Sequence, residues 1–348
     1  MKLLKFIKSE KKVNILPDLL EEVKKIRDKS TFVVLVPGTT GYSWMGVNRS
    51  TIVTFPDSCI ELPQNYSSCN LSNNELDILL NTIYKLQFEQ VILSGFPPYF
   101  DFIVRQLYNK GIKVKVLYHG FFSELADNLP QNVILKTIID LSAHGMIHAV
   151  GFNKKGMAET MKSLWGMNAF KYNFFSPIRV KKSHKTKRIK IGVLGNDQFR
   201  KNLHNQIAAA ALIENAEIHL TTEQDFSYLP NNVQLVRHKT GKGHQDFLDI
   251  LGGVDINLHL SFSESWGLLT AESLSMGIPC LVSYHSDIFD YDEDLFSLLV
   301  VKDYDNNLAI KDRIKEVLNT DGLADRCMNY LNKLNEISKE SLKAFLND

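Results

Sequence analysis

The chain has 348 residues, of which 44% are hydrophobic and 23% are charged, and this composition excludes a disordered or collagen-like chain. Its 40 Lys and Arg residues balance 39 Asp and Glu residues to a formal net charge of +1, so the chain as a whole does not attract nucleic acid and we expect no nucleic-acid partner. The four cysteines lack CxxC or zinc-type spacing, and apolar runs stay shorter than the roughly 18 residues of a membrane-spanning helix; both features predict a reduced cytoplasmic protein.

Short apolar runs alternate with longer amphipathic segments along the whole chain, which is typical of parallel sheets covered by helices. The class is therefore α/β. In a doubly wound sheet, ligands bind beyond the carboxyl ends of the strands, so the loops that follow the strands are where we expect chemistry. In the first half, strands are predicted at 32–36, 90–93, 114–118 and 146–150, and helices at 74–86, 100–110 and 154–165.

A basic segment divides the chain. Residues 179–190 read RVKKSHKTKRIK, with seven Lys or Arg residues and no acid. We interpret this segment as a solvated linker between domains at 1–178 and 191–330; a patch for phosphate or acidic lipid is the alternative.

The second half repeats the alternation and predicts a second doubly wound domain. Residues 309–345 have a helical pattern, and we expect the last part, 331–348, to be a helix that covers this domain or crosses back to the first. The predicted strands are 189–194, 216–221, 233–236, 254–260 and 279–283, and the predicted helices are 203–213, 244–251 and 268–276.

The most informative stretch is LSFSESWGLLTAESLSMGIPCLVS, residues 260–283. A buried strand leads through a short loop to Gly267, where a helix begins, and free amides at a helix N-terminus favour a bound anion such as phosphate. Glu264 precedes this helix and Glu272 lies within it, so the two carboxylates can accept hydroxyls on either side of a phosphate. In the alternative interpretation, Glu264 only caps the helix and Glu272 is solvated.

This stretch resembles the signature of the retaining glycosyltransferases of the GT-B fold, of the large family 4 type (glycosyl transferases group 1). The resemblance implies that Glu264 contacts the hydroxyls of the donor sugar, that the amides of Gly267 and Leu268 lie near the diphosphate with Ser263 and Leu269 beside them, and that Glu272 binds the ribose. The matching residues are Ser261, Glu264, Gly267, Leu268, Glu272, Gly277 and Pro279.

A second match follows the predicted strand at 189–194. The family has Gly-Arg at the start of this loop and Lys-Gly near its end, and the two cations hold the diphosphate. Here Gly195 is followed by Asn196 instead of Arg, while Arg200 and Lys201 stand at the end. The resemblance therefore implies a catalytic role for Lys201, with Arg200 as the substitute for the missing cation, because negative charge develops on the leaving diphosphate. An exposed basic pair is the alternative.

Two loops of the first half complete the set of candidate residues. His119 ends a predicted strand at the point where family members commonly place a His that faces the donor sugar; a lone His there is otherwise an ordinary polar residue. The loop Gly38, Thr39, Thr40 and Gly41 corresponds to a family loop near the diphosphate and the acceptor. An ordinary turn is the alternative, because Gly-Thr-Thr-Gly is not a phosphate loop.

We expect neither a metal nor another cofactor. Asp-x-Asp occurs at 290–292, 292–294 and 303–305, a spelling that holds Mn²⁺ or Mg²⁺ in a different glycosyltransferase fold, but these acids follow the last predicted strand and we interpret them as loop residues. The GxGxxG pattern of a dinucleotide oxidoreductase does not occur in the sequence.

The resemblance as a whole implies two Rossmann-like domains that face each other across a cleft. The enzyme would transfer a sugar from a UDP- or GDP-linked donor, with retention of configuration, to an unidentified hydroxyl of a glycan or lipid-linked glycan in polysaccharide or glycoconjugate synthesis. Base recognition is expected at 221–228 and 237–243, and residues 1–8, which are basic and apolar, allow peripheral contact with the inner face of a membrane. The rivals are a sugar-nucleotide epimerase or phosphorylase of this fold, a non-catalytic sugar-nucleotide-binding homologue and, with little support from a neutral chain, a transferase acting on DNA.

Overall fold

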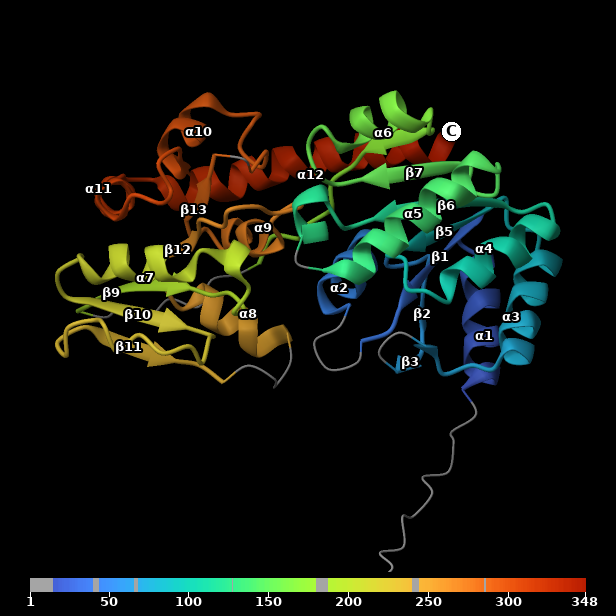
Figure 1. Cartoon of the computed structure of the whole chain (residues 1–348), viewed down its shortest axis with the longest axis horizontal. Coiled ribbons are helices and arrows are strands. Elements are labelled where there is room, and N and C mark those ends of the chain that lie inside the picture. Colours follow the sequence, from blue (N-terminus) through green and yellow to red (C-terminus); the bar gives the residue numbers. More distant parts are fainter. Residues whose placement is uncertain are drawn as a thin grey trace, which may run out of the picture.

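The computed structural model describes residues 15–39, 44–65, 68–126, 128–179, 187–239, 244–284 and 286–348. Two parallel sheets, each of six strands, lie side by side with helices packed against them (Figure 1). The basic segment at 1–8 and most of the basic linker, residues 180–186, fall outside the described residues. Within the described part of the chain, no helix combines the length and the apolar character that crossing a membrane requires.

The first sheet has the order β2-β1-β5-β6-β7-β8. Its strands are almost wholly apolar, as parallel strands buried on both faces must be; all five residues of β5 are buried. The strands are β1 (Phe32–Pro37), β2 (Cys59–Leu62), β5 (Gln90–Ser94), β6 (Lys113–Tyr118), β7 (Ala149–Phe152) and β8 (Ala169–Lys171), with the hairpin β3 (Gln64–Asn65) and β4 (Ser68–Cys69) beside them. The helices are α1 (Leu16–Arg27), α2 (Met45–Thr54), α3 (Asn73–Lys85), α4 (Phe100–Asn109), the 3-10 helix η1 (Phe122–Ala126), α5 (Leu129–Ala143) and α6 (Met157–Trp165).

The second sheet has the order β11-β10-β9-β12-β13-β14, which is the 3-2-1-4-5-6 order of dinucleotide-binding domains. Its strand order reverses between β9 and β12, and ligands bind at such a switch point. The strands are β9 (Ile189–Val193), β10 (Ala216–Leu220), β11 (Gln234–Arg237), β12 (Ile256–His259), β13 (Cys280–Ser283) and β14 (Val300–Val301). The helices are the 3-10 helix η2 (Phe199–Lys201), α7 (Leu203–Ala211), α8 (His244–Gly252), α9 (Leu268–Ser275), α10 (Glu293–Leu299), α11 (Asn307–Leu318) and α12 (Leu323–Asn347).

A buried asparagine fixes α9 against the second sheet. Asn257 on β12 is fully buried, and its side-chain amide donates to the Leu251 carbonyl at 3.1 Å and to the Ser273 hydroxyl of α9 at 2.8 Å. A Cβ at Gly192 of β9 would lie 2.2 Å from Asn257 Oδ1, so only glycine leaves room for this side chain at that position. Asn257 thus ties α9 to β12, one of the two strands at the switch point.

Several elements differ from those that the sequence predicts. The strand predicted at 146–150 is β7, three residues later, because the chain still turns at Gly145 with φ +70° and Met146 N donates to Leu141 O. The helical region at 309–345 is two helices, since Gly322 at φ +70° ends the connection from which α12 starts. The last helix therefore begins at Leu323 rather than at 331. The sequence prediction omitted the helices α1, α2, α5, α10, η1 and η2 and the strands β2, β3, β4, β8 and β14.

Helix α12 joins the two domains. It begins in the second domain and ends on the first (Figure 1). Asn335 exchanges two hydrogen bonds with the backbone of Ser176, at 2.8 and 2.9 Å. At the far end, the buried Lys115 of β6 donates its ammonium to the carbonyls of Phe345 at 2.6 Å and Leu346 at 3.0 Å. A cation is favourable at this position because the last carbonyls of a helix carry partial negative charge.

The loss of the Lys115 ammonium should loosen this junction. Lys115→Met keeps the apolar stem but leaves the buried Phe345 carbonyl without its ammonium donor, which costs about 1–3 kcal/mol of unfolding free energy. The Leu346 carbonyl keeps the Gln90 side-chain amide at 3.0 Å. Lys113→Met is the matched control, because Lys113 is exposed and its ammonium donates to the Asp348 carbonyl at 3.0 Å. Denaturant unfolding of both variants measures the difference, and equal losses would contradict a specific role for Lys115.

Candidate active site

The two domains enclose a cleft of about 1380 Å³. Residues that the sequence singles out on both sides line it. From the first domain come His119 and Gly120 after β6. From the second come Asn196, Arg200, Lys201, Glu264, Gly267, Leu268 and Leu269. The cleft thus lies beyond the carboxyl ends of β9 and β12, at the switch point of the second sheet.

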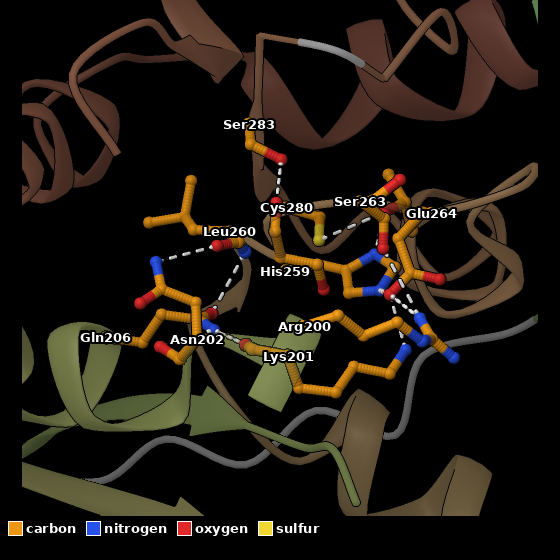
Figure 2. Close-up of polar contacts among 12 residues, drawn as sticks. Arg200, Lys201, Asn202, Gln206, His259, Leu260, Ser263, Glu264, Cys280 and Ser283 are labelled. Carbon is orange, nitrogen blue, oxygen red and sulfur yellow. Dashed lines mark hydrogen bonds and ion pairs between the residues drawn. The ribbon is translucent and has the colours of Figure 1, made fainter. Parts of the chain in front are cut away.

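An ion cluster forms the second-domain wall of this cleft (Figure 2). Glu264 Oε1 accepts from Lys201 Nζ at 2.5 Å and from Arg200 Nη1 at 2.9 Å, and His259 Nε2 lies 3.3 Å away. The Arg200 guanidinium also donates to the Ser263 carbonyl at 3.3 Å and lies 5.6 Å from the centre of the Phe121 ring of the first domain. Arg200 therefore contacts both walls of the cleft.

The charges in this cluster set the ionisation of Glu264. Burial alone raises the pKa of a carboxyl group, but Lys201, His259 and Arg200 together hold the pKa of Glu264 well below its ordinary value. Burial lowers the pKa of Lys201, and Glu264 opposes that change. Glu264 is therefore an ionised carboxylate with two cations on one oxygen, and no described residue donates to its second oxygen.

Local chain geometry places these groups. The 3-10 turn η2 carries Arg200 and Lys201, and Asn202, at φ +53°, closes it. The buried Asn202 side chain donates to the Leu260 carbonyl at 3.0 Å, while the Gln206 carboxamide oxygen accepts from the Leu260 amide at 3.0 Å. The loop after β9 is thus tied to the end of β12, which fixes both cations opposite Glu264.

Gly267 begins α9 in the left-handed region, with φ +87°. No side chain caps the first turn of α9 in the described structure, so the amides of Leu268 and Leu269 remain available at the cleft, as an anion site requires.

Of the other predicted donor residues, Gly195 packs beside Leu203 and its carbonyl accepts from the Thr221 hydroxyl at 3.2 Å. Gly195 lies behind the cleft wall rather than among the described residues that line it.

His119 faces the cleft from the first domain in a neutral form. Burial lowers its pKa to about 3. Its Nε2 lies 2.9 Å from the Ser94 hydroxyl, and its ring stacks on Phe174 with 4.7 Å between centroids. A neutral imidazole held in this way can exchange a hydrogen bond with a sugar hydroxyl but does not supply positive charge.

Glu272 lies on α9, one turn after its first residue, Leu268. Its carboxylate pairs with Arg49 of the first domain, and His244 Nε2 lies 3.4 Å from its Oε1. Burial raises the pKa of Glu272 to about 7, and Arg49 and then Arg179 oppose that rise. The structure thus gives Glu272 a partner that the sequence did not indicate.

The loop predicted beside the diphosphate is described only in part. Gly38 is buried and its amide donates to the Leu62 carbonyl at 2.7 Å, whereas Thr39 is exposed. Neither is among the described residues that line the cleft. Thr40 and Gly41 lie outside the described residues, as do residues 240–243 of the segment expected to face the base.

Three acids of the Asp-x-Asp runs have protein partners in the described structure. Asp290 pairs with Lys155 of the first domain, Asp292 accepts from the Leu295 amide at the start of α10, and Asp303 accepts from Asn306. Among the residues that the structure describes, no three His, Cys, Asp or Glu side chains gather as a metal site.

Sequence reasoning missed Arg49, Glu124 and His259. Glu124, on η1, lines the cleft opposite the cations, and burial raises its pKa while Arg200 opposes that rise. Its segment carries no motif. His259 was detectable, because it is the last residue of the strand that leads into the motif.

The second half of the chain matches a known family. Residues 175–334 match the family described as glycosyl transferases group 1. A comparison of the sequence with curated proteins finds no match.

Solved structures match nearly the whole chain. Anabaena HepE in complex with UDP is 13% identical, with coverage of 90% of this chain and 100% of its own and a TM-score of 0.65. Sucrose-phosphate synthase from Thermosynechococcus elongatus is 11% identical, with 91% and 100% covered and a TM-score of 0.60. WaaG, a glycosyltransferase involved in lipopolysaccharide biosynthesis, is 11% identical, with 88% and 95% covered and a TM-score of 0.54. These likenesses confirm the predicted GT-B architecture.

Replacement of Glu264 should leave two buried cations without their common partner. We expect Glu264→Gln to lower the unfolding free energy by about 3 kcal/mol, and inorganic pyrophosphate to stabilise this variant more than the wild type. In the wild type, the contribution of Glu264 is present above the ordinary pKa of a glutamate and is lost as the pH falls through the lower folded-state pKa.

Denaturant unfolding with and without pyrophosphate measures both effects. Glu124→Gln is the control, because Glu124 lines the same cleft and its pKa is raised rather than lowered. An equal loss in the two variants would show that Glu264 has no special role in holding the cations.

Proposed function

We propose that this GT-B protein transfers a sugar from a nucleotide-diphosphate sugar to an acceptor hydroxyl, with retention of anomeric configuration; the match of residues 175–334 to the glycosyl transferases group 1 family supports the proposal. The observation that carries the proposal is the cluster of Arg200, Lys201 and Glu264 beside the N-terminus of α9, at the switch point of the second sheet. This arrangement offers two cations and free amides to a diphosphate, and a carboxylate oxygen to the sugar attached to it.

The cations act on the leaving group. When the bond between the anomeric carbon and the diphosphate oxygen breaks, the electron pair stays on the diphosphate, and negative charge develops there. Lys201 and Arg200 are held in place before the reaction by Glu264 and the Ser263 carbonyl, so they stabilise this charge without reorganisation. The acceptor hydroxyl bonds to the anomeric carbon, and its proton passes to the departing diphosphate.

The remaining residues orient the donor. Glu264 accepts from sugar hydroxyls through its second oxygen, the neutral His119 hydrogen-bonds the sugar from the first domain, and Glu272 receives the ribose hydroxyls. A cleft between two domains also limits access of water to the sugar while its anomeric carbon is cationic, which favours transfer over hydrolysis.

We propose further that the reaction needs no divalent metal, because Arg200 and Lys201 supply the positive charge that a metal would otherwise bring to the diphosphate. UDP is the first donor nucleotide to test, since Anabaena HepE is described in complex with UDP; GDP is the second. The acceptor is a hydroxyl of a glycan or lipid-linked glycan. Peripheral contact of residues 1–8 with a membrane stays a prediction.

A nucleotide panel tests the donor. UDP, GDP, ADP and their glucose conjugates are compared at one common concentration; a nucleotide present at 100 times its dissociation constant should add about 2.7 kcal/mol of stability, and EDTA should leave this gain unchanged. Thermal shift ranks the nucleotides, and the best donor is then incubated with candidate acceptors. Release of the free nucleoside diphosphate together with a new glycosidic product supports transfer, whereas an epimerised donor or a sugar 1-phosphate supports a rival activity. Restoration of binding by Mn²⁺ after EDTA would contradict metal independence.

The cation pair tests the mechanism. Arg200→Ala and Lys201→Ala should each lower turnover by about 10²–10³, the usual effect of removing one preorganised donor from a developing anion. Arg188→Ala is the matched control, because Arg188 lies 3.8 Å from Glu217 on the other side of the domain. Asn196→Arg should raise turnover little. A normal rate in Arg200→Ala with a many-fold gain in Asn196→Arg would show that Arg200 has not replaced the missing cation.

A further inference from the structure

Arg49 links the first domain to α8 and α9 of the second. Its guanidinium lies between two side chains of the other domain: Nη2 is 3.0 Å from Glu272 Oε1 and 3.2 Å from Oε2, and Nη1 is 2.8 Å from His244 Nδ1. The Glu272 side chain is 9% exposed and the Arg49 side chain 21%. The three residues come from α2, α9 and α8, so the cluster exists only when the two domains are together.

The hydrogen bonds define the protonation of His244. A guanidinium only donates, so His244 Nδ1 accepts and the ring is neutral, with its proton on Nε2 beside Glu272. Burial, with Arg49 and Arg179, lowers the pKa of His244 to about 3, in agreement with this geometry. The cluster is therefore one cation and one carboxylate joined by a neutral imidazole.

The packing of α2 on α9 brings Arg49 to this place. A Cβ at Gly46 would lie 3.6 Å from Leu268 Cδ1, so the start of α2 packs against the first residue of α9. Arg49 lies one turn after Gly46, and Glu272 one turn after Leu268, so the next contact between the two helices is this ion pair.

We propose that Arg49 is a positioning residue: from the first domain it holds Glu272 and His244 in the arrangement that receives the nucleoside of the donor, so that closure of the domains and nucleotide binding are coupled. The inference rests on the proposed function, which places the ribose at Glu272. A carboxylate accepts about four hydrogen bonds, and Arg49 occupies one side of it, so the ribose hydroxyls and Arg49 can be bound together.

Charge provides the coupling. Burial raises the pKa of Glu272 to about 7, and Arg49 and then Arg179 oppose that rise. His244, the third group that faces the carboxyl, is neutral and adds no charge. Without Arg49 the carboxyl takes up a proton at higher pH and then accepts poorly from ribose. A nearby opposite charge changes a carboxyl pKa by about 1–3 units. Arg49 of the first domain therefore controls whether Glu272 of the second is the ionised carboxylate that accepts hydrogen bonds from ribose.

Calorimetric titration of UDP tests this inference. We expect Arg49→Gln to weaken UDP binding about tenfold at pH 7.5, and the pH below which affinity falls to rise by about 1 unit or more. Arg49→Lys, which keeps the charge, should retain most of the wild-type affinity and the wild-type pH profile. Arg326→Gln is the matched control, since Arg326 pairs with Asp294 on the surface at 3.6 Å, and it should match the wild type.

Glu272→Gln separates the inference from the function on which it rests. The Glu272→Gln variant should bind UDP weakly at every pH, and adding Arg49→Gln should then have little further effect. The pH profile of Glu272→Gln also measures the titration of the UDP phosphate itself. Wild-type affinity and pH profile in Arg49→Gln, with weak binding by Glu272→Gln, would overturn the role of Arg49 and leave the proposed function intact. A wild-type protein that binds neither UDP nor GDP would overturn both.

Discussion

The cleft depends on the attachment of two cations to one carboxylate oxygen. Arg200 and Lys201 both bind Glu264 Oε1, and either cation alone would be costly in so buried a place. With a single negative charge against two positive ones, these three residues keep an excess of positive charge. Their positions are set before any ligand arrives, which is the condition for efficient stabilisation of a developing anion.

The order of the second sheet makes that attachment possible. β9 and β12 are neighbours, but the chain between them forms β10 and β11 on the far side of β9. The loop with the cations and the loop with Glu264 therefore meet at the carboxyl edge, although 63 or 64 residues separate their members. Asn202, Gln206 and the Leu260 backbone tie the two loops together, so the strand order brings the residues near and hydrogen bonds fix them.

The sequence predicted most secondary-structure elements and the motif around Glu264, but it missed the contact of Arg49 with Glu272 between the two domains. Most strands and helices were found, because buried parallel strands are continuous apolar runs, and the motif around Glu264 was found because its spacing lies within one strand-loop-helix unit. Most of the missed elements are short or weakly amphipathic, and α2, MGVNRSTIVT, has no clear apolar face. Helix α1 was missed despite its regular apolar face of Leu16, Leu19, Val23 and Ile26. Arg49 therefore carried no signal, since its role comes from a contact across 223 positions that no local pattern encodes.

The two glutamates of the motif differ in what controls their charge. Glu264 has its cations on its own domain, and they hold its pKa well below the ordinary value. Glu272 has its nearest cation on the other domain, and burial raises its pKa to about 7. When their environments separate the pKa values of two carboxyl groups in this way, the two groups can take different roles. Glu264, which faces the diphosphate and sugar, thus has its partner cations within its own domain. Glu272, which accepts hydrogen bonds from the nucleoside, gains its partner cation Arg49 only when the domains meet.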